Sequence, residues 1–279
     1  MGITVLTEYF ASPHAGRRKE ILKSIEVNCR IPQTHEIVLF MEPSTENLQH
    51  IRSLSRILRP ECFDKIRIHE VSRRSTYSDF FEYANTHLGG RACVLCNNDI
   101  SFDESLDEIE NATDFDLDGH FICLTRWDVM KDNSLKFKEP VRVRKNSQDA
   151  WIFKPLLPTK MIEKGGFYMG RPGCDGMIAY LATISGLKLL NPSKLIRIKH
   201  FHLSNHRTYK RQHRLGGPDI YMSTFPTDKI QHSYSNVMYR FNEPSRGELL
   251  GREGVNKAIE REMENGVHWD YALEKCMKL

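Results

Sequence analysis

Residues 91–103 read RACVLCNNDISFD, an apolar run that ends abruptly in three polar side chains. A short continuous apolar run of this kind is typical of a strand buried on both faces of a parallel sheet. Asn97, Asn98 and Asp99 follow it directly. Ligands of open α/β sheets bind beyond the carboxyl ends of the strands. The stretch therefore predicts a buried strand that presents polar side chains to a ligand.

The chain before this stretch alternates between apolar runs and helical periodicity. Strands are expected at residues 3–6, 35–41 and 65–71, and helices at residues 12–30, 48–58 and 77–88. Such alternation indicates βαβ units and a parallel sheet covered by helices on both faces. Beyond residue 100 the pattern loosens, with strands expected at 121–129, 150–153 and 195–202 and helices at 175–185 and 255–278.

Composition and motifs exclude several classes of protein. The 279 residues are 40% hydrophobic and 27% charged, as in a soluble globular protein, and the net charge of +4 is too small to indicate nucleic-acid binding. We expect no membrane span, because no apolar run approaches about 18 residues, and no signal peptide, because the N-terminus lacks a basic region. Neither a GxGxxG nor a GxxxxGK[ST] motif is present.

The seven cysteines favour free thiols in a reducing compartment, and therefore a cytoplasmic protein. Their number is odd, and Cys93 and Cys96 lie within the apolar run. They form a CxxC pair, but no second pair has the spacing of a zinc site.

Asp99, with Asp103 four residues later, has two interpretations on spacing alone. Carboxylate and amide oxygens at a strand end suit Mg²⁺ or Mn²⁺, which bridge the phosphates of a nucleotide. Asn and Asp are equally common in turns and helix caps. The residues by themselves leave both alternatives open.

Residues 77–103, YSDFFEYANTHLGGRACVLCNNDISFD, resemble the segment that leads to the DxD motif of GT-A glycosyltransferases. The resemblance implies a Rossmann-type, mostly parallel central sheet flanked by helices in one domain. It also implies that Asp99 binds Mn²⁺ or Mg²⁺, and that Asn97 and Asn98 contact the donor nucleotide. The motif departs from the family, because NND stands in place of DxD.

Residues 166–209 carry a second resemblance to the same family. Asp175 stands where inverting members hold their general base, at the start of a helix beneath the acceptor site. The alternative is a helix cap, in which case Asp149 is the candidate base. Trp151 could offer a ring face to a sugar, but its pattern favours packing in the core.

The resemblance further assigns the metal or diphosphate site a histidine near the end of the core. His202 is the preferred metal ligand, and His200 is the alternative or a diphosphate contact. Arg207 is expected to neutralise the leaving diphosphate, whereas Lys210 is as readily a solvated surface residue.

Polar and aromatic side chains at two other strand ends complete the expected donor site. They follow the first and third strands, where the family holds the nucleotide. They are Thr7, Tyr9, Phe10, Arg73, Arg74, Tyr77 and Asp79. Arginine suits a diphosphate, and tyrosine or phenylalanine suits stacking on a base.

The sequence thus predicts a metal-assisted glycosyltransferase that moves a sugar from a nucleotide-diphosphate donor, expected to be a UDP-sugar, to a hydroxyl of a glycan or glycoprotein. Residues 1–210 are expected to form the catalytic domain, and residues 211–279 a basic segment and helix that pack on it. In size and layout the chain resembles small soluble glycosyltransferases of large algal DNA viruses. That resemblance suggests a viral protein of the host cytoplasm and UDP-xylose as donor. The alternatives are a non-catalytic nucleotide- or sugar-binding module and a sugar nucleotidyltransferase.

Overall fold

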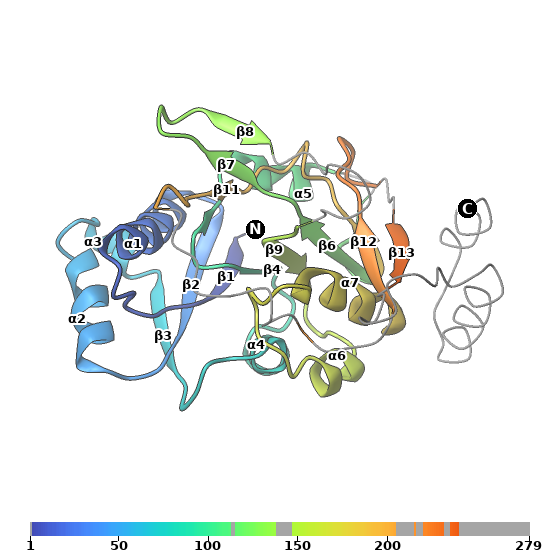
Figure 1. The fold of residues 1–279 in the computed structure, drawn as a ribbon, viewed down its shortest axis with the longest axis horizontal. Helices are drawn as coiled ribbons and strands as arrows, with labels where there is room; N and C mark the ends of the chain where they lie inside the picture. The colour runs from blue at the N-terminus through green and yellow to red at the C-terminus, as the bar shows by residue number, and fades with distance from the viewer. Residues whose placement is uncertain are drawn as a thin grey trace, which may run out of the picture.

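The computed structural model describes residues 2–112, 115–137, 147–204, 215, 220–231 and 235–239. A seven-stranded sheet lies at its centre, with the strand order β10-β6-β9-β4-β1-β2-β3 (Figure 1). Its strands are β1 (Ile3–Glu8), β2 (Thr34–Met41), β3 (Ile66–Glu70), β4 (Cys93–Cys96), β6 (His120–Leu124), β9 (Ala150–Phe153) and β10 (Lys188–Leu190). The prediction of a mostly parallel central sheet flanked by helices is confirmed.

One strand, β9, runs against the others. It pairs antiparallel with both β4 and β6, with Cys96 opposite Ala150, whereas the remaining neighbours are parallel. The amino end of β9 therefore lies beside the carboxyl end of β4. This reversal brings Asp149, just before β9, to the sheet edge that holds Asp99.

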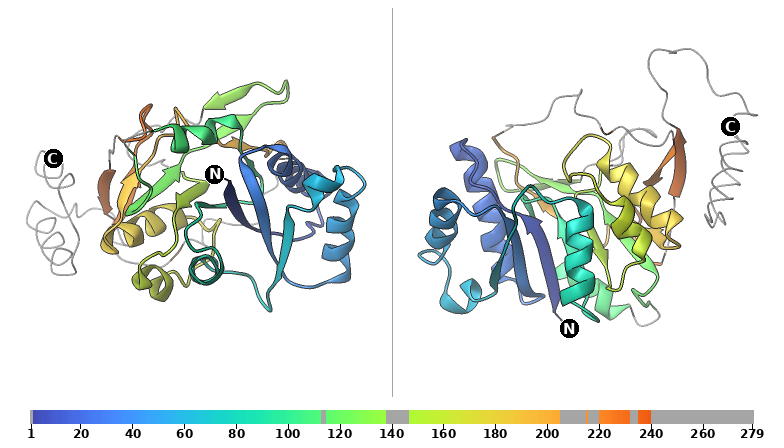
Figure 2. Two further views of the ribbon diagram at one scale, coloured as in Figure 1. Left: turned by 180° about the vertical axis from the view of Figure 1, so that it is seen from behind. Right: turned by 90° about the horizontal axis from the view of Figure 1, so that it is seen from below.

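Helices cover both faces of the sheet, as the alternation predicts. One face is covered by α1 (Ala15–Arg30), α2 (Thr45–Leu54) and α3 (Pro60–Phe63), and the other by α4 (Tyr77–His87), α6 (Thr159–Lys164) and α7 (Cys174–Ile184) (Figures 1 and 2). Each face has its own apolar core, with Ile25 and Leu54 in one and Phe80, Phe81 and Ile178 in the other. Burial of these side chains holds the helices against the sheet, with a favourable free energy of about 25 cal/mol per Å² of apolar surface removed from water.

Smaller elements complete the fold around the main sheet. A four-stranded sheet has the order β5-β11-β7-β8, and a two-stranded ladder joins β12 to β13. The bounds are β5 (Ile100–Ser101), η1 (Glu104–Asp107), α5 (Glu108–Asn111), β7 (Trp127–Val129), β8 (Leu135–Phe137), β11 (Lys199–His200), β12 (Ile220–Thr224) and β13 (Ser235–Tyr239). β12 packs against α7, so part of the chain beyond residue 210 contacts the core.

Local capping explains where the helices begin. Ser44 Oγ accepts the Asn47 N–H, so α2 starts three residues before the predicted residue 48. The side chains of Thr76 and Asp79 form a capping box at the start of α4. Gly173 precedes α7 with φ of 92°, a left-handed conformation that favours glycine.

Two predicted strands are wrong. Residues 121–129 divide into β6 and β7, because Ser193 Oγ accepts the Thr125 N–H and residues 127–129 pair with other strands. Residues 195–202 contain only the two-residue β11, because the Leu195 and Ile196 amides turn back to the Pro192 carbonyl. The helix predicted at residues 255–278 lies outside the described residues.

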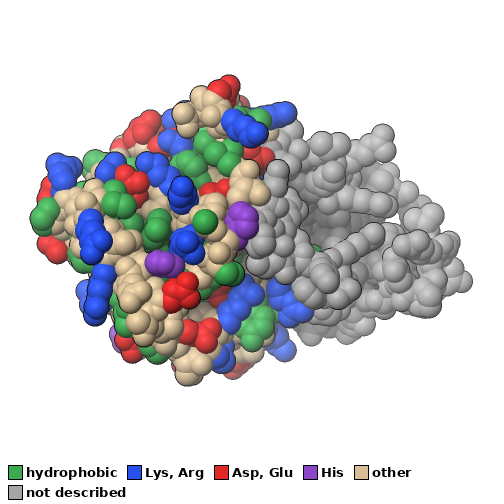
Figure 3. Space-filling view, turned by 60° about the vertical axis from the view of Figure 1, so that its left-hand side comes forward, with side chains coloured by type: hydrophobic (Ala, Val, Ile, Leu, Met, Phe, Trp, Pro, Cys, Tyr) green, Lys and Arg blue, Asp and Glu red, His purple; other side chains and the backbone are tan. Residues whose placement is uncertain are grey.

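Other features concern thiols and surface. The six cysteines in the described part of the chain are buried and free, as predicted. Within the same residues, no helix combines the length and apolarity that crossing a bilayer requires. On the face in Figure 3, basic and acidic side chains are interleaved over the part that is described.

Candidate functional site

Asp99 is the centre of a cluster of buried charged side chains at the carboxyl edge of the main sheet. It lies three residues beyond β4 and is 4% exposed. Its Oδ2 lies 2.5 Å from Arg17 Nη1, 3.0 Å from His200 Nε2 and 3.7 Å from His202 Nδ1. Burial alone would raise the pKa of Asp99, but the hydrogen bond from His200 and the charges of His200 and Arg17 bring it well below its usual value.

His200 is fixed from both sides of its ring. Nε2 faces Asp99, while Nδ1 lies 2.9 Å from Asp128 Oδ1 on β7. Burial opposes protonation, but the hydrogen bonds to Asp128 and Asp99 raise the pKa of His200 to about 9. Its ring stacks on that of His202, with centroids 5.3 Å apart and planes 6° apart. The two imidazoles are therefore held in one orientation.

Arg126, in the turn between β6 and β7, joins this cluster to a second one. Its Nε donates to Asp128 Oδ1 at 2.9 Å, and its Nη1 donates to both oxygens of Asp149 at 3.0 and 3.2 Å. Burial opposes its charge, but both carboxylates together raise the pKa of Arg126. Asn97 Nδ2 donates to Asp149 Oδ1 at 2.8 Å. The Asn97 side chain, which the sequence suggests as a contact of the donor nucleotide, is therefore already hydrogen-bonded to a carboxylate.

Asp175 lies in the first turn of α7 and belongs to the second cluster. Burial, followed by the charge of Asp149, raises the pKa of Asp175 to about 7. The Cys174 thiol lies 3.0 Å from Asp175 Oδ1 and donates to it. A carboxyl group with a pKa near neutrality exchanges protons readily at neutral pH, as general acid–base catalysis requires.

The donor set at Asp99 fits a divalent cation. Asp99, His200 and His202 each offer one ligand atom, and the three atoms lie within 4.8 Å of one another. Adjacent donors of an octahedral ion at about 2.1 Å stand about 3 Å apart. Asp128 supplies the carboxylate that commonly orients a ligating imidazole. Ligation by His200 requires its Nε2 proton to leave.

Tyr77 and Trp151 lie in the core. Both side chains are fully buried, and their rings meet edge to face at 5.3 Å. Trp151 therefore has no ring face open to a sugar, and Tyr77 none open to a base. Thr7 is also buried, and its hydroxyl donates to the Cys96 carbonyl, which ties β1 to β4.

The remaining donor-site candidates lie at the ends of β1 and β3. Tyr9 is buried, and burial raises the pKa of its hydroxyl, while Phe10 is 39% exposed. Arg73 makes a bidentate ion pair with Asp79, the capping residue of α4. Of these side chains, Phe10 is the aromatic one that is open to a ligand.

Arg74 is held at the same edge by three groups. It makes two contacts of 3.2 Å with Glu8, donates to the Met169 carbonyl at 2.8 Å, and lies over the Tyr168 ring at 5.2 Å. These contacts join the end of β1 to the segment before α7.

Three residues of the cluster were missed from the sequence: Arg17, Arg126 and Asp128. Arg17 could have been found from the sequence, because it is a basic residue at the start of the first helix, which follows the end of the first strand. Arg207 and Lys210, in contrast, lie outside the described residues.

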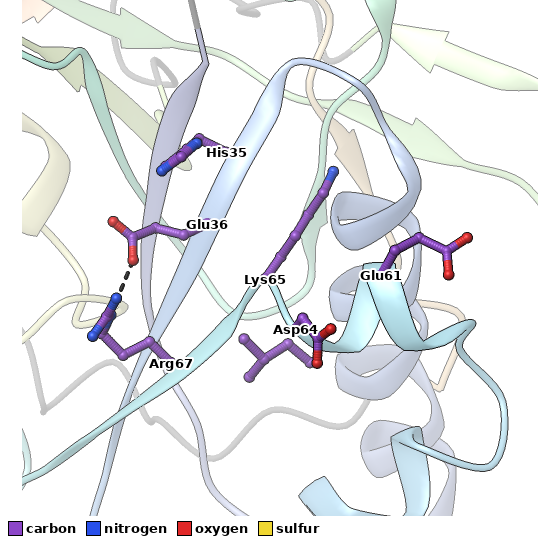
Figure 4. Close-up of a pocket in the computed structure, with 7 residues that line it drawn as sticks. His35, Glu36, Glu61, Asp64, Lys65 and Arg67 are labelled. Atoms are coloured by element: carbon purple, nitrogen blue, oxygen red, sulfur yellow. Dashed lines mark hydrogen bonds and ion pairs between the residues drawn. The ribbon is translucent and has the colours of Figure 1, made fainter.

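A separate hollow of about 470 Å³ lies at the opposite edge of the sheet (Figure 4). It is formed at the amino ends of β2 and β3 and is lined by His35, Glu36, Glu61, Asp64, Lys65, Ile66 and Arg67. Glu36 and Arg67 form an ion pair of 3.0 Å there. Its acidic and basic side chains are mixed, and it is remote from the Asp99 cluster.

Comparisons with known proteins find similarity in structure but not in sequence. No protein-family model and no curated protein matches the chain. A mannosyltransferase from Pyrobaculum calidifontis, solved with GDP-mannose and Mn²⁺, has a TM-score of 0.46 and 14% identity over 76% of this chain and 58% of its own. TarS from S. aureus with UDP-GlcNAc has a TM-score of 0.47 and 12% identity over 78% of this chain and 63% of its own.

A different enzyme is also among the similar structures. The 4-diphosphocytidyl-2C-methyl-D-erythritol synthase of Anaerococcus prevotii has a TM-score of 0.45 and 16% identity over 76% of this chain and 92% of its own. This chain spans less than two thirds of the length of the mannosyltransferase and of TarS.

Proposed function

We propose that this protein is a nucleotide-sugar-dependent glycosyltransferase whose active site is the carboxyl edge of the main sheet. The observation that carries the proposal is the juxtaposition of two clusters through Arg126. One cluster, around Asp99, suits a divalent cation and a diphosphate. The other contains Asp149 and Asp175, whose mutual repulsion suits general-base chemistry.

In this proposal Asp99, His202 and His200 hold Mn²⁺ or Mg²⁺. When bound, the ion would supply positive charge to the leaving nucleoside diphosphate. Asp128 fixes the His200 ring by the 2.9 Å contact with its Nδ1. The exposed Phe10, after β1, is the side chain available to contact the base of the nucleotide.

The proposed general base is Asp175, which would accept the proton of the acceptor hydroxyl. The raised pKa of Asp175 matches this role at neutral pH. Arg126 keeps the neighbouring Asp149 paired, so Asp149 is the less available carboxylate. The acceptor is proposed to be a glycan or a glycoprotein, and the catalytic domain to span residues 1–210.

The test is a donor panel of UDP-xylose, UDP-glucose, UDP-GlcNAc and GDP-mannose, with and without Mn²⁺. Release of nucleoside diphosphate and the melting temperature are followed for the wild type, Asp99→Asn and the exposed control Asp64→Asn. A ligand at one hundred times its Kd stabilises the native state by about 2.7 kcal/mol. Stabilisation or release that Asp99→Asn abolishes and Asp64→Asn retains supports the proposal. The absence of any response to all donors would contradict it.

A second candidate function is a sugar nucleotidyltransferase. It is favoured by Arg17, a basic side chain that follows β1 and reaches Asp99, because such enzymes usually carry a basic residue after their first strand. Incubation with nucleoside triphosphates and sugar 1-phosphates separates the two functions, because a nucleotidyltransferase releases pyrophosphate and a glycosyltransferase does not.

A further inference from the structure

Arg17 brings a guanidinium to the carboxylate that would bind a divalent cation. It lies in the first turn of α1, and its Nη1 is 2.5 Å from Asp99 Oδ2. Its Nη2 donates to Asn98 Oδ1 at 3.0 Å. The side chains of Arg17 and Asp99 are only 15% and 5% exposed, so this is an enclosed contact. Charge-assisted contacts of this kind are short and directional.

The same guanidinium also occupies the lone pair of His202. Arg17 Nη1 lies 3.2 Å from His202 Nδ1. Arginine has no acceptor, so Nδ1 must be the acceptor, and an imidazole nitrogen has a single lone pair for this purpose. His202 therefore binds Arg17 or a metal ion through Nδ1, but not both. Electrostatic repulsion between the two cations at Asp99 acts in the same direction.

A neighbouring carboxylate provides a second position for the guanidinium. Glu20 Oε2, one helical turn from Arg17, already lies 3.4 Å from its Nη1. Glu20 is 7% exposed and is held by the Ser204 N–H at 2.6 Å and the Ser204 hydroxyl at 3.0 Å. A small rotation of the Arg17 side chain would keep its charge paired while releasing Asp99 and His202.

We propose that Arg17 and a divalent cation are alternative occupants of one position, defined by Asp99 and His202. Arg17 fills that position when no ion is bound and moves toward Glu20 when an ion enters. The inference concerns the metal site of the proposed transferase, and it rests on that proposal for the presence of a metal ion there. Because ion binding is measured without donor or acceptor, it succeeds or fails independently of sugar transfer.

The test is the affinity for Mn²⁺ alone, measured from the electron paramagnetic resonance of free Mn²⁺. Arg17→Met removes the competing charge while keeping a similar apolar stem. Arg18→Met is the matched control, since Arg18 Nη1 donates to the Ser12 carbonyl at 2.8 Å. The apparent Kd scales inversely with the fraction of protein in which the site is open. We expect Arg17→Met to tighten Mn²⁺ binding at least tenfold, and Arg18→Met to change it less than twofold.

An unchanged or weakened Mn²⁺ affinity in a folded Arg17→Met protein would overturn the inference, because Arg17 would then support the ion or be irrelevant to it. If neither the wild type nor Arg17→Met binds Mn²⁺, the inference is overturned as well. If Arg17→Met does not fold, the wild type provides the readout, through the side-chain ¹⁵N–¹H signals of its arginines. Saturation with Mg²⁺ is expected to shift the Arg17 signal and leave that of Arg18 in place. An unmoved Arg17 signal at saturation contradicts the exchange.

Discussion

Asp128 Oδ1 lies 2.9 Å from His200 Nδ1 and holds the opposite ring nitrogen, Nε2, toward Asp99. The same Asp128 oxygen accepts from Arg126 Nε at 2.9 Å. One carboxylate thus orients a candidate metal ligand and connects it to the cluster that contains Asp149. Partners of this kind commonly change metal affinity without touching the ion.

Asp128→Asn is expected to weaken Mn²⁺ binding by about 10- to 100-fold, because the amide no longer fixes the orientation and basicity of His200. The direction is opposite to that expected for Arg17→Met. The measurement is a Mn²⁺ titration of both variants and of Asp132→Asn, which replaces an aspartate in the turn after β7 that bonds to nearby Ser134. Equal affinities in Asp128→Asn and Asp132→Asn would remove Asp128 from the site.

Asp175→Asn is expected to stabilise the protein at alkaline pH. The pKa of Asp175 is raised to about 7 from an ordinary value of 3.8. The folded state therefore binds more protons than the unfolded state between these values. The stability contributed by protonated Asp175 is full below about pH 4 and is lost as pH rises through about 7.

The measurement is urea unfolding of the wild type and Asp175→Asn at pH 5 and pH 8. Each unit of pKa displacement corresponds to about 1.4 kcal/mol. The variant should therefore exceed the wild type by more than about 1 kcal/mol at pH 8, and by less at pH 5. The control is Asp64→Asn, which replaces an exposed carboxylate. A difference that does not grow with pH would show that Asp175 carries no raised pKa.

The first four strands, and the position of Asp99 just beyond the end of β4, could be predicted because their signals are local. Apolar runs mark β1, β2 and β4, and a polar triplet follows β4. The contacts of the site join segments that are distant in the sequence. Arg17 is 82 residues from Asp99, and His200 is 72 residues from Asp128. No periodicity within one segment reports such a contact.

The same reasoning explains the side chains whose predicted exposure differs from their position. Tyr77 and Trp151 have aromatic rings of the kind that stack on a base or a sugar, but α4 and β9 place these rings against each other in the core. Hydrophobicity alone does not distinguish an aromatic ring at a ligand site from one in a core. The antiparallel direction of β9, which decides where Asp149 lies, follows from pairing with β4 and β6.

Arg74→Met is expected to destabilise the protein by about 1 kcal/mol, because it leaves Glu8 buried without its partner. Burial raises the pKa of Glu8 and the Arg74 charge opposes that rise. The estimate is modest since the Arg74 side chain is 48% exposed. Urea unfolding is the measurement, with Arg73→Met, which breaks a more exposed pair with Asp79, as the control.

The double variant Glu8→Gln with Arg74→Met completes this cycle. Replacing the carboxylate by an amide removes the unpaired charge, so the double variant should recover part of the loss. Coupling energies of contacting residues are commonly about 0.5–3 kcal/mol. Strict additivity of the two single variants would show that the Glu8–Arg74 contact contributes nothing to stability.

Asp175 and Asp149 are distinguished as bases by kinetics once a donor is known. If Asp175 is the base, Asp175→Asn should lower kcat by about 10²- to 10⁴-fold, with little change in KM for the donor. Because Asp175 must be ionised to accept a proton, kcat/KM of the wild type should rise with pH through about 7. Cys174→Ala provides the sharper test, since its thiol donates to Asp175 Oδ1 and so lowers the pKa of that carboxyl. Loss of the donor should move the rise in kcat/KM to higher pH while leaving the plateau similar. A large loss of kcat in Asp149→Asn, together with an Asp175→Asn variant that keeps its kcat, would instead assign the base to Asp149.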